Sequence, residues 1–249
     1  MKTIFKKTVI FLLCMFLSII TFGQEKNKYN DEIKGVKVSP PKFIGSEELL
    51  TILNKDEFAS LNDYMTKHFQ YPEKSIELFE EGTEVVQFVV TPQGEVTDFN
   101  IINSVSPAID KEVIRVLKTT SKLWKPGLNN EKPVSMGKEI SIVFKLENTT
   151  DFTKRATKFY MMGAKMLLVK ERPKLALNIF NQAITLRPNE KCILLGRGMA
   201  KYELGDKSGA CRDWNRIKAL GGFEGDVYLD NYCEMKGYFD MISALQGKE

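Results

Sequence analysis

The chain has 249 residues, of which 43% are hydrophobic and 27% charged, so it has the composition of a globular protein with one large domain or two small ones. Its formal net charge of +4 would fall to +1 on removal of residues 1–23, which hold Lys2, Lys6 and Lys7 and no acidic residue. A nearly neutral protein lacks the clustered basic charge that nucleic acids attract, so no nucleic-acid partner is expected. The chain has one histidine, His68, and no P-loop, G-x-S-x-G or H-E-x-x-H motif. We therefore predict a protein that is not an enzyme, with no catalytic residue, cofactor or metal site.

The N-terminus has the pattern of an export signal. Three lysines precede an uncharged apolar run from Thr8 to Phe22, and the small residue Gly23 follows. The run is shorter than the roughly 20 residues that span a hydrocarbon core as a helix. We predict a signal peptide over 1–23, cleaved near Gly23, and a periplasmic or outer-membrane-associated protein that contacts membrane only through this segment or a partner. The alternative is a retained inner-membrane anchor.

A change of pattern marks the start of the first domain. Residues 24–55 are polar with little periodicity, which predicts a tether. A domain is expected over 56–148. At its start, apolar residues recur at the three- and four-residue spacing of an amphipathic helix that ends before Pro72. The residues of this stripe are Phe58, Leu61, Tyr64, Met65 and Phe69.

The centre of this domain reads as strand, turn, strand, helix, strand. Two β-branched runs, Thr83–Val90 and Glu95–Ile102, flank Pro92-Gln93-Gly94, which favours a tight turn. Residues 107–122 follow with helical period, and a third alternating run covers 140–146. The predicted fold class is α+β: a three-stranded antiparallel sheet with two helices, followed by an all-α region.

The all-α region is expected over 152–249 as tetratricopeptide-like repeats with a closing helix. Helical period replaces the strand pattern after Asn148, and small and large residues recur thirty-four residues apart, the period of such a repeat. A generic helical hairpin is the alternative. The matched pairs are Ala164 with Gly198, Ala176 with Ala210, and Phe180 with Trp214.

Three cysteines lie outside the predicted signal peptide, so at most one internal bridge can form. Cys211 lies on the second helix of the second repeat, and Cys233 on the closing helix expected to cover it. A Cys211–Cys233 disulfide and two buried free thiols both fit this pattern.

The segment from about Leu61 to Leu146 resembles the C-terminal domain of TonB, a protein that links an inner-membrane motor to outer-membrane receptors. The resemblance covers about a third of the chain and depends on an ordered set of motifs. The motifs are Gln70-Tyr71-Pro72, Gly82, Val85–Val90, Thr91-Pro92-Gln93-Gly94-Glu95-Val96, Asp110–Val116, Trp124-Lys125-Pro126-Gly127 and Ile140–Phe144.

The resemblance implies a protein or peptide partner, such as the N-terminal segment of an outer-membrane receptor, added as a strand beside the last strand, Lys138–Leu146. It also nominates the Gln-Tyr-Pro element as a contact, although a structural role for Tyr71 and Pro72 is the alternative. Trp124 is expected in the core. The sequence is also compatible with a homo-oligomer of this chain. The nominated partner-binding residues are Gln70, Tyr71, Pro72, Lys138, Ile140, Ile142 and Phe144.

The same residues support two functions. The first is an exported adaptor of the cell envelope that captures an extended peptide. The second is a TonB-type energy transducer for outer-membrane transport, which requires residues 1–23 to remain as an anchor. The short tether and the predicted loss of the anchor favour the adaptor.

Overall fold

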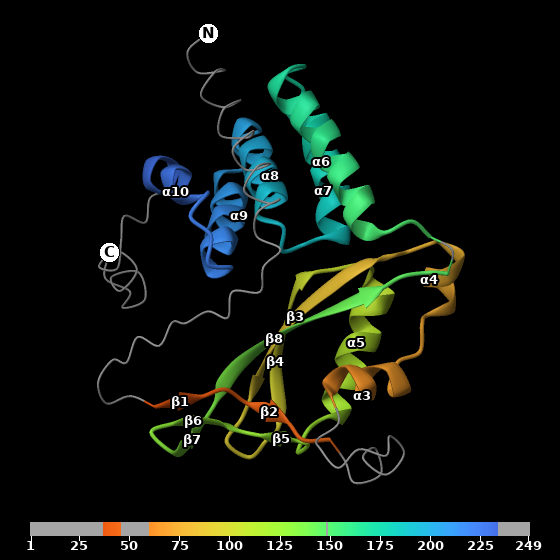
Figure 1. Ribbon diagram of the computed structural model, residues 1–249, viewed down its shortest axis with the longest axis vertical. Helices are drawn as coiled ribbons and strands as arrows, with labels where there is room; N and C mark the ends of the chain where they lie inside the picture. Colours follow the sequence, from red (N-terminus) through yellow and green to blue (C-terminus); the bar gives the residue numbers. More distant parts are fainter. Residues whose placement is uncertain (1–36, 46–59, 148, 234–249) are drawn as a thin grey trace. The chain divides into compact units, whose positions relative to one another are not determined.

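The computed structural model describes residues 37–45, 60–147 and 149–233 (Figure 1). The chain divides into two compact units between Thr149 and Thr150. In the three described ranges, no helix has the length and apolar character needed to cross a membrane. The predicted signal peptide lies outside these ranges.

The first unit is built on a three-stranded antiparallel sheet, as the sequence predicted. Its strand order is β4-β3-β8, so β3, the first of these three strands in the chain, lies in the middle. The β3–β4 turn contains Gly94, whose φ is +77° and whose added Cβ would lie 2.5 Å from the Trp124 carbonyl oxygen. Only glycine fits this close approach. The strands are β3 (Gly82–Val90), β4 (Val96–Asn103) and β8 (Met136–Phe144).

The last strand was predicted over Lys138–Leu146, but in the structure it begins at Met136 and ends at Phe144. Leu146, expected within it, lies beyond the ladder, and its N–H donates to Glu81 Oε1 at 2.9 Å. A side chain therefore takes over the hydrogen bonding where β8 leaves the sheet.

An amphipathic helix packs on one face of the sheet. Helix α5 (Pro107–Thr119) begins with Ser106 as N-cap and proline in its first turn, and it buries Ile109, Val113, Val116 and Leu117. These side chains pack against Val86, Phe88 and Val90 of β3. Each fully buried side chain of this size contributes about 1.5–3 kcal/mol, so this layer forms much of the core.

Two shorter helices lie before the sheet in the chain. Helix α3 (Leu61–His68) begins with a capping box formed by Ser60 and Asp63. Helix α4 (Glu73–Glu77) follows, with Pro72 as its N-cap. The start of the predicted helix, at Phe58, lies outside the described residues.

Part of the predicted tether differs from expectation, because residues 38–43 pair with the first unit. Phe43 is buried, with its ring centroid 5.6 Å from that of Tyr64 and 5.3 Å from that of Trp124. Segments this short carry no readable period, so they could not be predicted from the sequence. The strands are β1 (Val38–Ser39) and β2 (Lys42–Phe43), which pair with β6 (Gly127–Asn129) and β5 (Trp124–Lys125), and β7 (Lys132–Val134), which pairs with β6.

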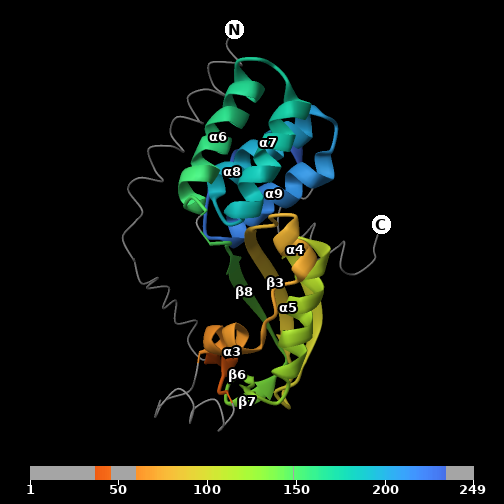
Figure 2. The same ribbon diagram turned by 90° about the vertical axis from the view of Figure 1, so that its right-hand side faces the viewer.

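The second unit is helical, as predicted. Its helices pack in chain order, each against the next (Figure 2). Two contacts recur: an added Cβ on Gly163 would meet the ring of Phe180, and one on Gly198 would meet Trp214. Both hairpins thus place glycine against a large ring; their tetratricopeptide character stays a prediction. The helices are α6 (Phe152–Leu168), α7 (Pro173–Leu186), α8 (Lys191–Glu203), α9 (Lys207–Ala219) and α10 (Asp226–Tyr232).

A disulfide joins the last described helices. Cys211 on α9 is bonded to Cys233, the C-cap of α10, with a Cα–Cα distance of 5.9 Å. Cys192 does not take part in this bridge. The bridge closes a loop of 22 residues, which in the chain-entropy treatment contributes about 3 kcal/mol.

Candidate functional site

Strand β8 is one edge of the sheet. It pairs with β3 in unbroken register over nine positions, from Gly82–Phe144 to Val90–Met136. Among the described residues, no strand pairs with its other side. An edge of this kind presents a row of backbone donors and acceptors to a further strand.

The hydrogen bonds of β3 indicate which β8 backbone groups face outward. In an antiparallel pair, successive residues direct their N–H and C=O alternately to one side and then the other. The Thr83 carbonyl accepts from Asn103 Nδ2 of β4 at 2.7 Å, and the Thr91 N–H donates to the Glu95 carbonyl across the β3–β4 turn at 2.9 Å. The odd-numbered residues of β3 therefore face β4, and the even-numbered ones bond to β8.

The same alternation of odd and even residues applies to β8, because the β3–β8 register is continuous. The even-numbered partners in β8 use their backbone groups on β3. The odd-numbered residues direct theirs to the free edge. The outward-facing residues are Gly137, Glu139, Ser141 and Val143.

The nominated residues on this strand therefore do not offer their backbone groups to the free edge, and their part in binding a partner stays a prediction. Lys138, Ile140, Ile142 and Phe144 bond through their backbone to β3, and their side chains lie on the helix-covered face. The strand alternation was visible in the sequence, but its register was not. The bonds made by Thr83 and Thr91 identify the outward-facing set.

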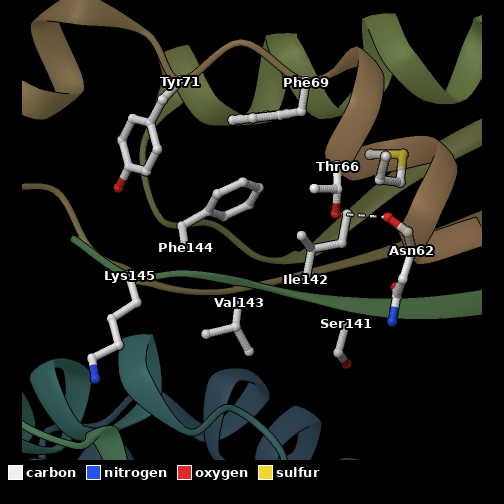
Figure 3. A pocket seen from close by; sticks show the side chains of 10 residues that line it. Asn62, Thr66, Phe69, Tyr71, Ser141, Ile142, Val143, Phe144 and Lys145 are labelled. Carbon is white, nitrogen blue, oxygen red and sulfur yellow. Dashed lines mark hydrogen bonds between the residues drawn. The ribbon is translucent and has the colours of Figure 1, made fainter. Parts of the chain in front are cut away.

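A groove of about 460 Å³ runs beside the free edge (Figure 3). One wall is β8 and the other is α3 with the chain that follows it. Because the groove adjoins the unpaired side of the strand, an added strand would lie along it. The lining residues are Asn62, Met65, Thr66, Phe69, Tyr71 and Ser141–Lys145.

Aromatic rings close one end of the groove. The Phe144 ring centroid lies 4.7 Å from that of Phe69 and 5.9 Å from that of Tyr71, and the Tyr71 ring is perpendicular to it. The Tyr71 hydroxyl donates to the Glu80 carbonyl, and burial raises the pKa of this hydroxyl. Tyr71 thus has the packing role that was one of its two alternatives, and it also lines the groove; its contact with a partner stays a prediction.

The other two members of the Gln-Tyr-Pro element are not among the groove-lining residues. Pro72 caps α4, and the Gln70 backbone N–H donates to Glu112 Oε1 of α5 at 2.9 Å. The structure therefore brings only Tyr71 of this element to the edge of β8, together with Phe144 and Ile142.

An ion pair on α5, which was not predicted from the sequence, fixes the corner that carries these rings. Arg115 donates to the His68 carbonyl at 2.9 Å and to both Glu112 carboxylate oxygens, at 2.6 and 2.7 Å. The hydrogen bond from Arg115 holds the pKa of the Glu112 carboxyl below its usual value. Together the pair binds the backbone on both sides of Phe69.

A buried carboxyl lies behind the same strand. Glu84 of β3, opposite Ile142, is fully buried; its Oε2 accepts the Val105 N–H at 2.8 Å, and its Oε1 has no hydrogen-bond partner. Burial raises the pKa of Glu84 to about 8, with Asp110 adding to the shift. This carboxyl is consequently protonated over much of the range near neutral pH.

His68 and Trp124, also singled out from the sequence, pack within the first unit. The His68 ring stacks on Tyr64 with centroids 4.0 Å apart. Trp124 is buried, as expected, and its Nε1 donates to Thr120 Oγ1 at 3.0 Å. In the part of the chain that the structure describes, no three His, Cys, Asp or Glu residues gather as metal ligands would.

Comparison with curated proteins and with solved structures finds no match for this chain. A family model does match one segment, and that segment contains the Gln-Tyr-Pro element, the three-stranded sheet and α5. Residues 67–146 are thus similar to the family described as the Gram-negative bacterial TonB protein C-terminal.

Proposed function

We propose that this protein is an exported, non-catalytic adaptor of the bacterial cell envelope that binds an extended peptide segment of another protein along the free edge of β8. The observation that carries the proposal is the unbroken β8 edge with the groove beside it. Strand addition at such an edge obtains affinity from main-chain hydrogen bonds, and neighbouring pockets supply specificity.

The family match supports a protein partner in the envelope. The matched segment, residues 67–146, contains both walls of the groove except its beginning at Asn62, Met65 and Thr66. TonB C-terminal domains interact with proteins such as outer-membrane receptors, and a receptor's N-terminal segment is the partner we favour.

The helical unit supplies a second surface for protein contacts in this proposal. Its paired helices, with glycine against Phe180 in one hairpin and against Trp214 in the next, support an assignment to tetratricopeptide-like repeats. A protein with two binding units is an adaptor in the physical sense, because it can hold two partners at once.

A proline at Val143 tests the edge directly. Val143→Pro removes an outward-facing donor and leaves the β3–β8 hydrogen bonds in place, and proline is tolerated on sheet edges. We expect peptides selected from an eight-residue display library on the wild-type protein to bind this variant at least about tenfold more weakly by calorimetry. Val143→Ala, which keeps the N–H, is the matched control and should bind normally.

Equal affinity of Val143→Pro and Val143→Ala, with both melting as cooperatively as the wild type, contradicts strand addition at this edge. Ile142→Pro is an unsuitable probe, because its N–H bonds to β3 and its loss weakens the sheet itself.

The N-terminus separates the adaptor from the energy transducer. Cleavage near Gly23 leaves no anchor for coupling to an inner-membrane motor, whereas the transducer needs residues 1–23. Intact-mass measurement of the protein recovered from the envelope should give a chain that begins near Gln24. A chain that begins at Met1 and sediments with the inner membrane supports the transducer instead.

A further inference from the structure

We propose that the groove beside β8 selects partner segments by two alternate side chains, one large and apolar, the other uncharged and able to form hydrogen bonds. This inference depends on the proposed strand addition and adds to it the chemistry of the partner. It follows from which side chains of the groove an added strand would meet, and in what order.

Residues paired across neighbouring strands project to the same face of a sheet. A partner residue opposite Ile142 or Phe144 therefore faces α3, as those two side chains do in Figure 3. One opposite Val143 faces the other side, where Val143 itself is 61% exposed. Two groove-facing partner positions result, two residues or about 7 Å apart.

The position opposite Phe144 is walled by aromatic rings. Phe69 and Tyr71 are half-buried and lie with Phe144 at the end of the groove. A Leu, Ile or Phe side chain placed here would cover ring surface that is otherwise open to water. Burial of a side chain of that size is the largest single contribution available in this groove.

The position opposite Ile142 has a mixed wall. Asn62 and Thr66, both exposed on α3, face this part of the groove, and the buried Met65 also lines the groove. Thr66 Oγ1 donates to the Asn62 carbonyl at 2.8 Å, which leaves lone pairs on the hydroxyl oxygen. The Asn62 amide can both donate and accept, so a Ser, Thr, Asn or Gln side chain fits this position.

The groove offers no charge to either position. Lys145 is the one charged residue among those that line it, and in Figure 3 its side chain points away from the α3 wall. A charged partner side chain on the α3 side would therefore lose hydration without an opposite charge in return. Uncharged side chains are selected at both positions.

The fixed order of the two positions also sets the direction of the partner. An antiparallel segment meets the aromatic position first and the mixed position two residues later, so it reads apolar-x-polar from its N-terminus. A parallel segment reads polar-x-apolar. The preferred order of a bound peptide consequently reports its orientation on β8.

The selection can be tested with three acetylated eight-residue peptides that have threonine at every position except those named here. One carries Leu-Thr-Asn at its centre, the second Asn-Thr-Leu, and the third only threonine. We expect one of the two orders to bind the full-length protein about tenfold more tightly than the other two peptides, from burial of the leucine in the aromatic position. Lysine or glutamate in place of the leucine should abolish that gain.

Asn62→Ala identifies the mixed position without disturbing the core, because Asn62 is exposed. This substitution should weaken binding of the preferred peptide. It should have less effect on binding of the same peptide with threonine in place of its asparagine. Lys67→Ala on the same helix serves as the control. Equal affinity for all three peptides overturns the selection, even if Val143→Pro still weakens binding and the edge itself is thereby supported. Failure of every peptide to bind the wild type counts against the proposed function as well.

Discussion

The two edges of the sheet in the first unit are built differently. Strand β8 keeps one register against β3 over nine positions, whereas β4 shifts register twice, between Val85 and Val86 and between Gln87 and Val89 of its partner. At the second shift, Asp98 adopts a φ of +52°. Bulges and a left-handed residue bend an edge strand and interrupt its row of donors and acceptors, so β4 is a poor template for another strand.

The contrast extends to what lies beside each edge. The groove beside β8 is lined by α3 and by the corner after it, which Glu112 and Arg115 of α5 hold through the His68 carbonyl and the Gln70 N–H. A regular edge alone would invite unspecific pairing. In the proposed function the groove would restrict which segments can pair at β8, and the irregular β4 edge would confine pairing to one side of the sheet.

The largest effect is expected for Phe144→Ala. This side chain is 5% exposed at the end of β8, and its removal leaves a cavity among the rings of Phe69 and Tyr71. The free energy of unfolding should fall by about 3 kcal/mol. Ile102→Ala on β4, where the side chain is 38% exposed, should cost far less in the same urea titration. Equal losses at the two edges would contradict the comparison.

Glu84→Gln should change how stability depends on pH. The folded-state pKa of about 8 lies above the ordinary value of 4.5, so the folded protein holds a proton that the unfolded chain releases. The contribution of Glu84 to the free energy of unfolding is then full below about pH 4.5. It is lost as pH rises through 8, by up to about 1.4 kcal/mol per pH unit. Urea titrations at pH 5, 7 and 8.5 should give a flatter profile for Glu84→Gln. Parallel profiles would indicate that Glu84 is ionised in the fold.

Glu112→Gln should weaken peptide binding modestly, by about threefold, because the corner that carries Phe69 and Tyr71 loses its charged anchor. The pKa of Glu112 is lowered in the fold, so its contribution is present above the ordinary carboxyl pKa and is lost as pH falls through the folded value. Wild-type affinity should therefore decline at acidic pH, and that of the variant should change less. Glu77→Gln is the control for an acidic residue outside this pair.

The smallest effect is expected at the opposite edge. Asp98→Gly places a residue without Cβ at a φ of +52° and should raise stability by up to about 1 kcal/mol. Peptide affinity should stay unchanged, because β4 takes no part in binding. A change in affinity comparable to that of Glu112→Gln would show that both edges contribute.

The sequence predicted the elements of this sheet better than its edges. The apolar stripe of residues 107–122 and the alternation of residues 140–146 were sufficient for α5 and for most of β8, because period alone identifies such elements. Residues 38–43 were missed because two-residue strands have no period. Outward-facing groups such as Val143 were missed because parity depends on tertiary hydrogen bonds, here those of Thr83 and Thr91. The Glu112–Arg115 spacing is that of an ordinary surface pair, and nothing local links it to His68.

The Cys211–Cys233 bridge has a consequence for the order in which the protein matures. The two thiols are separated by 22 residues, so the bond can close only after α10 has emerged behind α9 and only where an oxidant is present. A chain produced in a reducing cytosol would have α10 held by packing, through Tyr228 and Tyr232 against Trp214 and through the buried Leu229, without the covalent link. The state of this bond in a purified sample thus records the compartment in which the helical unit was completed.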